Sequence, residues 1–261
     1  MRRTMERRRS RAAIWSRRLA LFFVTVLLLS VGLHRFGLLS TPAALGSVAI
    51  SWGALATALA LGAIALARVW TRGIEGLRDA VIGIVVTALS LAVPAYFTVI
   101  LFRLPQINDV TTDTTAPPRF TVASSLRLPD ANSVAYAGQK SAELQHRYYS
   151  DLDSYRSSLG VDEAYEAVRQ VAEKSGWEIV LQNPPLNESS SATLEAVDHS
   201  LIMGFKDDIV VRVVPDETGA IVDIRSASRY GRHDLGVNAG RVRKFLTALR
   251  EEIAPTAGGE R

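Results

Sequence analysis

Three long apolar runs dominate the N-terminal part of the chain, at residues 19–33, 43–67 and 80–102. A helix that crosses the roughly 30 Å hydrocarbon layer of a bilayer needs about 20 apolar residues. The second and third runs meet this length directly. The first meets it if residues 36–39 complete one end and Arg17 and Arg18 extend toward the headgroups at the other. The pattern predicts a three-span membrane anchor over residues 19–103.

The distribution of charge predicts how this anchor is oriented. Residues 1–18 contain eight arginines and one acid, Glu6, and form a basic tail. The loop after the second run carries Arg68, Arg72 and Arg78. Basic segments stay on the cytoplasmic side, so three alternating spans place everything after the third run outside the cytoplasm. We expect a protein of the inner (plasma) membrane with a cytoplasmic N-terminus and a periplasmic, extracytoplasmic C-terminal domain.

The N-terminus has a competing interpretation as an export signal. Ser16-Arg17-Arg18 before an apolar run is similar to a twin-arginine signal, and a run of this length also fits a cleaved signal peptide. No small-x-small cleavage site follows closely, and two further apolar runs come after it. A retained anchor, whose arginines contact anionic lipid, is the better interpretation.

Composition narrows the class of the outer part. The chain has no cysteine, which excludes disulfides and thiolate metal sites. Residues 119–261 contain 17 basic and 21 acidic side chains, a net charge of −4. Because the whole chain has a net charge of +4, residues 1–118 carry +8. The basic character therefore belongs to the anchor, and the outer part lacks the positive surface that nucleic-acid binding needs. We expect no nucleic acid and no cofactor.

Periodicity after the anchor predicts a linker and one α+β domain. Proline and a Thr/Asp cluster indicate an extended linker at residues 104–119, followed by a domain at 120–254 and a flexible tail at 255–261. Helices are expected at 162–175 and 237–253, with weak helical character at 141–147. The expected strands are 177–182, 192–198, 201–205 continuing into 209–215, and 220–228.

Local residues support these elements. Asp162 can cap the first helix, and Gly176 followed by Trp177 is typical of a Schellman end. Residues 216–219, Asp-Glu-Thr-Gly, predict a hairpin turn between two β-branched runs. The fold class is therefore an antiparallel sheet with helices on one face, beside three transmembrane helices.

The most polar stretch, residues 223–242, lies between the last strand and the last helix. Arginines close to a helix N-terminus can bind a phosphate or carboxylate. The candidate anion site comprises Arg225, Ser228, Arg229, Asp234 and Asn238, with a lipid headgroup among the ligands considered. The alternative is a structural turn in which the arginines pair with acids such as Asp223 and Asp234.

Catalytic and metal sites are weaker hypotheses. Asp198-His199 and His233-Asp234 are possible base pairs for a hydrolase with Ser226 or Ser228, but no catalytic motif is present and adjacent strand residues face opposite ways. Four histidines are scattered through the sequence, and the acid pair Asp207-Asp208 lacks a calcium-loop pattern. We predict neither an enzyme nor a metal site.

A structural role is a further alternative. Small residues favour close helix packing in membranes, and the second apolar run offers many of them: Gly53, Ala54, Ala56, Ala58, Ala60, Gly62, Ala63 and Ala67. The chain could then be a subunit of an envelope complex, with envelope proteins and membrane lipids as partners. No charged residue lies mid-span, which disfavours a transporter.

Four motifs in order resemble the bacterial domain-of-unknown-function family 1499, over residues 104–249. They are LPQINDVTTDTTAPPRF, GWEIV, GFKDDIVVRVVP and VDIRSASRYGRHDLGVNAGRVRKFL. Members carry a run like Pro-x-Ile-x-Asp-Ile-Thr-Thr-Asp, matched here from Pro105 to Asp113; where they often have Asp-Pro-Pro, this chain has Ala116-Pro117-Pro118. The resemblance implies a membrane-associated or exported domain without established catalytic residues.

Overall fold

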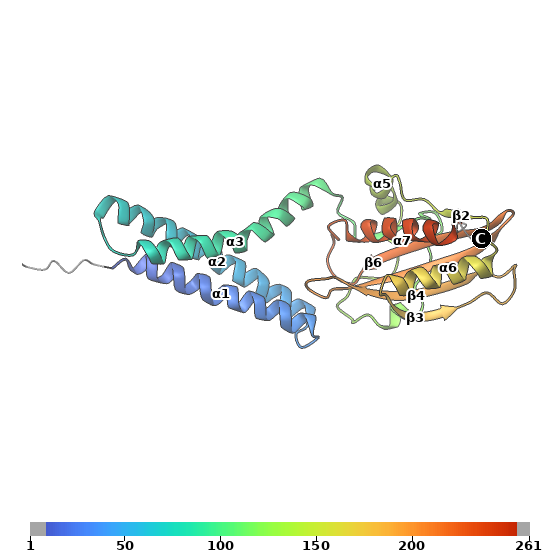
Figure 1. The fold of residues 1–261 in the computed structure, drawn as a ribbon, viewed down its shortest axis with the longest axis horizontal. Coiled ribbons are helices and arrows are strands. Elements are labelled where there is room, and N and C mark those ends of the chain that lie inside the picture. The colour runs from blue at the N-terminus through green and yellow to red at the C-terminus, as the bar shows by residue number, and fades with distance from the viewer. Residues whose placement is uncertain (1–8, 255–261) are drawn as a thin grey trace, which may run out of the picture. The chain divides into compact units, whose positions relative to one another are not determined.

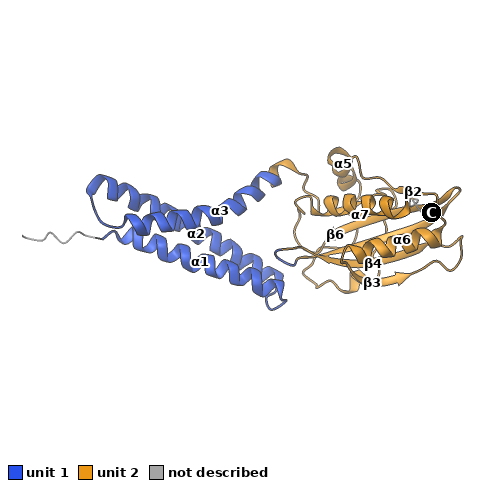
Figure 2. Ribbon diagram, viewed as in Figure 1, with its two compact units in different colours: residues 1–100, 202–204 blue, residues 101–201, 205–261 orange. Residues whose placement is uncertain are grey.

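The structure, a computed structural model, describes residues 9–254. The chain divides into two compact units, residues 1–100 with 202–204 and residues 101–201 with 205–261 (Figure 2). Residues 1–8 of the expected basic tail and the expected flexible tail at 255–261 lie outside the described residues.

Three long apolar helices form the first unit. They are α1 (Arg11–Arg35), α2 (Thr41–Arg72) and α3 (Leu77–Arg103), and each is long and apolar enough to cross a membrane. This confirms the prediction of three candidate spans. Residues 11–18, which we assigned to the tail, instead belong to α1, because Ser10 caps the helix there with a bond to the amide of Ala13.

Small residues bring the three helices together. The Ser16 hydroxyl of α1 donates to the carbonyl of Ala58 in α2 at 2.8 Å. A Cβ atom on Gly83 of α3 would lie 2.1 Å from the same hydroxyl oxygen, so only glycine fits there. Arg17 pairs with Asp79 at 2.6 Å. Of the small residues that we expected to favour packing in α2, Ala58 and Gly62 are buried within this unit.

The second unit is built on a six-stranded antiparallel sheet. The strand order is β1-β6-β5-β4-β3, and β2 pairs with the other end of β6 beside β1. The strands are β1 (Asp109–Thr111), β2 (Tyr155–Ser157), β3 (Glu178–Asn183), β4 (Ala192–His199), β5 (Lys206–Asp216) and β6 (Gly219–Ser228). The expected turn joins β5 to β6, since Asp216 pairs with Gly219.

Helices α6 (Val161–Lys174) and α7 (Val237–Ile253) pack on one face of this sheet (Figure 1). Alternate residues of β4, β5 and β6 meet the apolar stripes of both helices in one core, where Trp177 stacks on Phe245 at 5.4 Å. The remaining helices are α4 (Val122–Ser125) and α5 (Gln139–Tyr148). This arrangement confirms the α+β fold class.

The prediction for the C-terminal end of α6 is right, and the prediction for its N-terminal end is wrong. Gly176 adopts a left-handed φ of 73°, and the amide of Trp177 donates to the carbonyl of Ala172 at 3.2 Å, which is the Schellman bond expected there. The N-cap is Gly160, with no side-chain cap, so the expected capping by Asp162 is wrong. Asp162 lies in the first turn instead, where its charge still favours the helix dipole.

Two segments differ from the sequence predictions. Residues 109–111, inside the expected linker, form strand β1 and pair with β6, so this segment is part of the domain. Residues 201–205, expected as a strand, lie in the turn between β4 and β5, which the Ser200 amide closes with a 2.8 Å bond to the carbonyl of Phe205. Gly204, with φ of 70°, takes the chain out of the extended conformation there.

Candidate functional site

The sheet face opposite α6 and α7 is a polar layer. Successive side chains of a strand point to opposite faces of the sheet, so every second residue of each strand lies on this face. Its charged side chains include Glu195, Asp208, Asp223 and Arg225, which are buried, and Arg212, which is partly exposed. The segment before α5 covers the layer through a small apolar cluster of Phe120, Ala123, Val134, Val210 and Ala227.

Arg225 joins the entering chain to the last strand. Its Nε and Nη2 atoms donate to the two carboxylate oxygens of Asp109 at 2.9 and 2.7 Å, and the pair is buried, with Arg225 only 3% exposed. Nη1 donates to the carbonyl of Pro118, and Nη2 donates also to that of Val134. The guanidinium lies 4.8 Å from the ring centre of Phe120. The charge is thus fully engaged by the protein.

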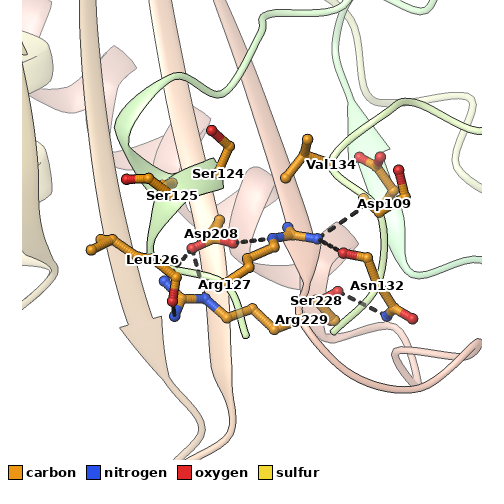
Figure 3. A network of polar contacts seen from close by, with 12 residues as sticks. Asp109, Ser124, Ser125, Leu126, Arg127, Asn132, Val134, Asp208, Ser228 and Arg229 are labelled. Atoms are coloured by element: carbon orange, nitrogen blue, oxygen red, sulfur yellow. Dashed lines mark hydrogen bonds and ion pairs between the residues drawn. The ribbon is translucent and has the colours of Figure 1, made fainter. Parts of the chain in front are cut away.

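Arg229 and Arg127 converge on one buried carboxylate (Figure 3). Arg229 donates to Oδ1 of Asp208 through Nε at 3.0 Å and Nη2 at 2.7 Å, and Arg127 donates to Oδ2 at 2.7 Å. Arg229 also donates to the carbonyl of Leu126. Asp208 has no exposed surface, so two cations balance a charge that water cannot reach.

Arg212 forms a third ion-pair cluster nearer the surface. Its Nη2 atom contacts Asp113 at 2.9 Å and Asp223 at 2.7 Å. Burial raises the pKa of Asp113, but bonds from the Ala116 amide and from Arg212 outweigh it and lower the pKa below its usual value. The Thr112 hydroxyl donates to Asp223 at 3.1 Å, which ties the covering segment to β6.

A separate network lies on the helix-facing side of the sheet. The Asn238 amide nitrogen donates to the Ser228 hydroxyl at 2.9 Å, and its oxygen accepts from Ser226 at 2.7 Å and from Arg241 at 2.8 Å. Arg241 also pairs with Asp207 at 2.7 Å. These bonds join the end of β6 to the first turn of α7.

Asp234 binds the start of α7, whose N-cap residue is Gly236. Its carboxylate accepts bonds from the amides of Gly236 at 3.0 Å and Asn238 at 2.8 Å, so it satisfies free amides there. Burial raises the pKa of this carboxyl even though both bonds lower it. Asp234, which we considered as a partner for an arginine, therefore stabilises the start of α7 instead.

The five residues predicted as an anion site occupy both sides of the sheet. Arg225 and Arg229 lie in the polar layer, whereas Ser228, Asp234 and Asn238 lie toward α7. The arginine partners are Asp109 and Asp208 in place of the expected Asp223 and Asp234. This geometry favours the alternative of a turn held by ion pairs.

Sequence reasoning missed the acids and one arginine of these networks. Asp109 precedes Arg225 by 116 residues, and no local pattern links them. Asp207 and Asp208 were noted only as a candidate calcium pair, but adjacent strand residues serve opposite faces, one pairing with Arg241 and the other with Arg229. The motifs behind the family resemblance were the available clue, since they supply residues to all of these networks.

The histidine pairs do not form a hydrolase site. The Nδ1 atom of His233 accepts from the Leu235 amide at 2.9 Å, so Nε2 carries the proton and faces the Leu104 carbonyl at 3.3 Å. Asp198 pairs with Arg241 rather than with His199. Ser226 and Ser228 bond to Asn238. Among residues 9–254 no cluster of three metal-ligating side chains is found.

An open groove of about 800 Å³ lies beside the polar layer, next to the edge strand β3. Six of the nine residues that line it have polar side chains, namely Thr115, Arg119, Thr121, Asn183, Thr193 and Arg212, and the other three are Ala116, Pro117 and Leu181. Arg119 is exposed and forms no ion pair with any carboxylate in the described part of the chain. The Nε atom of Arg212 is buried and has no hydrogen-bond partner in the same range. Among residues 9–254 the groove thus has one exposed, unpaired guanidinium in Arg119, as the β6–α7 turn has in Arg232.

Comparison with known proteins identifies the family of the second unit but not a function. The family model described as "Protein of unknown function (DUF1499)" matches residues 109–249. The match begins at β1 and ends within α7, which confirms the resemblance found in the sequence. Neither the curated proteins nor the solved structures gave a match.

Replacing Arg229 by alanine should destabilise the domain strongly, because buried Asp208 would keep only Arg127 as partner. Breaking a buried pair costs about 3–5 kcal/mol. Arg232→Ala is the matched control: this arginine is exposed and unpaired among residues 9–254, so its loss should leave stability unchanged. Denaturant unfolding of the full chain in detergent, followed by tryptophan fluorescence, measures both. Equal, small effects would contradict the structural role of Arg229.

Proposed function

Because the chain belongs to the DUF1499 family, whose function is unknown, its role has to be inferred from its own geometry; we propose that it is an inner-membrane protein that displays an extracytoplasmic binding module. The module takes a ligand with a carboxylate or phosphate group. The observation that carries the proposal is the groove, in which Arg119 is an exposed cation that pairs with no carboxylate of residues 9–254.

The groove combines charge with directional donors. Arg212 also lines the groove, but Asp113 and Asp223 offset its charge and its Nε–H is buried. Hydroxyl and amide groups from threonine and asparagine side chains complete the lining. A carboxylate or phosphate accepts bonds from such an array, and the single unbalanced charge of Arg119 favours a small anion over a neutral molecule. Free metabolites and lipid headgroups share this chemistry.

The polar layer supports the groove. Arg212 is held between two carboxylates, and Thr121 is held because its amide and hydroxyl both donate to the buried carboxylate of Glu195, the amide at 2.6 Å. The groove wall is therefore ordered before any ligand arrives, which lowers the entropic cost of binding. In this proposal the buried ion pairs act indirectly, by positioning the residues that touch the ligand.

The orientation of the anchor follows from the basic residues. Eight arginines before residue 19 and three around the α2–α3 loop favour the cytoplasm. A cysteine-free chain allows a direct test with single cysteines at two exposed positions. Leu186→Cys, in the domain, should react with a membrane-impermeant maleimide in intact spheroplasts, and Thr71→Cys, at the end of α2, only after permeabilisation. The reverse pattern would overturn the assigned orientation.

Ligand binding is tested with the full chain in nanodiscs of neutral lipid. A ligand that binds only the folded state raises its stability, by about 2.7 kcal/mol at 100 times the dissociation constant. We expect a saturable rise in the melting temperature of the domain with phosphate, a carboxylate or a soluble glycerophosphate headgroup. The rise should disappear in Arg119→Ala and persist in Arg232→Ala.

Two other outcomes contradict the groove. If none of these anions changes the melting temperature, the domain does not bind this class of ligand. If the rise persists in Arg119→Ala but disappears in Arg232→Ala, the anion binds at the β6–α7 turn, near the five residues predicted from the sequence. If the soluble glycerophosphate headgroup raises the melting temperature and phosphate and the carboxylate do not, the natural ligand is a lipid headgroup.

A further inference from the structure

The turn between β4 and β5 exposes large apolar side chains. Residues 200–205 read Ser-Leu-Ile-Met-Gly-Phe, where a hairpin connection is ordinarily polar. Leu201 is 87% exposed and Ile202 is 68% exposed. Two adjacent aliphatic side chains in water at the end of a hairpin are unfavourable, which raises the question of what covers them.

Strand register places this turn at the end of the sheet where the chain arrives from α3. Asp109, the first residue of β1, pairs with Ala227, and Ala227 pairs with Asp208. Lys206, two residues earlier in β5, pairs with His199 at the base of the turn. Since β1 and β5 are both antiparallel to β6, they run in the same direction and begin at the same end of the sheet. The turn and the incoming chain therefore share that end.

The covalent connection limits how far this end can lie from the membrane. The third apolar run finishes at Phe102, and Arg103 is the last residue of α3. Six residue steps separate Arg103 from Asp109, which span at most about 21 Å when fully extended. The actual path is shorter, because the carbonyl of Ile107 accepts a 3.1 Å bond from the Asp234 amide and Leu104 contacts His233. The apolar turn is thus within reach of the bilayer surface.

The charges around the turn suit a lipid surface. Lys206 and Arg232 are exposed at this end of the domain. Of the acids near them, Asp207 and Asp198 pair with Arg241, and Asp130 accepts a bond from the Tyr230 hydroxyl. Cations that flank a pair of aliphatic side chains match an interfacial position, with the apolar groups below the headgroups and the ammonium and guanidinium groups among them.

We propose that Leu201 and Ile202 insert into the interfacial layer of the bilayer that holds α1, α2 and α3, with Lys206 and Arg232 facing anionic headgroups. The domain is then attached to the membrane at two points, the α3 connection and this turn. The inference does not depend on the ligand groove or on the side of the membrane, because the chain connection is the same on either side.

The test uses the full, cysteine-free chain in nanodiscs, with an environment-sensitive fluorophore on Leu201→Cys. Leu186→Cys is the matched control: it is also an exposed leucine, at 93%, but lies in the β3–β4 connection at the opposite end of the sheet. The discs contain phosphatidylcholine alone or mixed with phosphatidylglycerol, with and without lipid that carries a nitroxide quencher high on its acyl chain.

The label at position 201 should emit at shorter wavelength than the label at 186 and lose several-fold more fluorescence to the nitroxide lipid. Adding Ile202→Asp to the 201-labelled chain should abolish this quenching, because a carboxylate opposes insertion. Phosphatidylglycerol should increase the quenching, and the combined substitutions Lys206→Gln and Arg232→Gln should remove that increase.

Three results would overturn the inference. Water-like emission at position 201 without nitroxide quenching would mean that the turn stays in solvent. A blue shift without nitroxide quenching would mean that protein, either this chain or another copy, covers the turn. Quenching that is equal with and without phosphatidylglycerol would remove the role of the two cations. None of these results affects the anion test, which depends on Arg119.

Discussion

The DUF1499 domain depends on a buried ion pair between Asp109 and Arg225. Asp109 belongs to the chain that has just left α3, and Arg225 belongs to the last strand of the sheet. A buried charge without its partner is strongly unfavourable, so this pair requires the entering segment to stay on the sheet. Because the same guanidinium also holds the carbonyls of Pro118 and Val134, one side chain fixes three points of the covering segment.

The remaining polar contacts extend the same principle. Asp208 pairs with Arg229 and Arg127. Asp223 pairs with Arg212 and accepts a hydrogen bond from the hydroxyl of Thr112. The motifs that carry the family resemblance therefore meet in space: Asp109 of the DVTTD run pairs with Arg225, and Asp208 of the KDD run pairs with Arg229. Their polarity is explained by a buried layer whose charges must be paired. Arg119, an exposed arginine that pairs with no carboxylate among residues 9–254, lies at the groove, which is why the groove carries the functional proposal.

Long, periodic elements could be predicted from the sequence, and contacts between distant segments could not. The three apolar helices, α6, β6 and α7 follow from repeated local patterns, and the left-handed Gly176 follows from its place after a helix. Strands β1 and β2 have three residues each, too few for any alternation, and both depend on β6 for pairing. The turn at residues 201–205 was predicted as a strand because exposed and buried apolar residues look alike in sequence. The partners predicted for Arg225 and Arg229 were wrong because each observed ion pair joins segments that are distant in the sequence, and no local pattern links them.

The measurement that tests this account most directly is a double-mutant cycle on Asp109 and Arg225 in the full chain. If Asp109 and Arg225 form this buried pair, the two alanine substitutions should couple by at least about 2 kcal/mol in the free energy of unfolding. The reason is that either substitution alone leaves the other charge buried without its partner. The second substitution should then cost little once the first is present. Independent effects that simply add, with coupling below about 0.5 kcal/mol, would show that the two side chains do not depend on each other and would contradict the account.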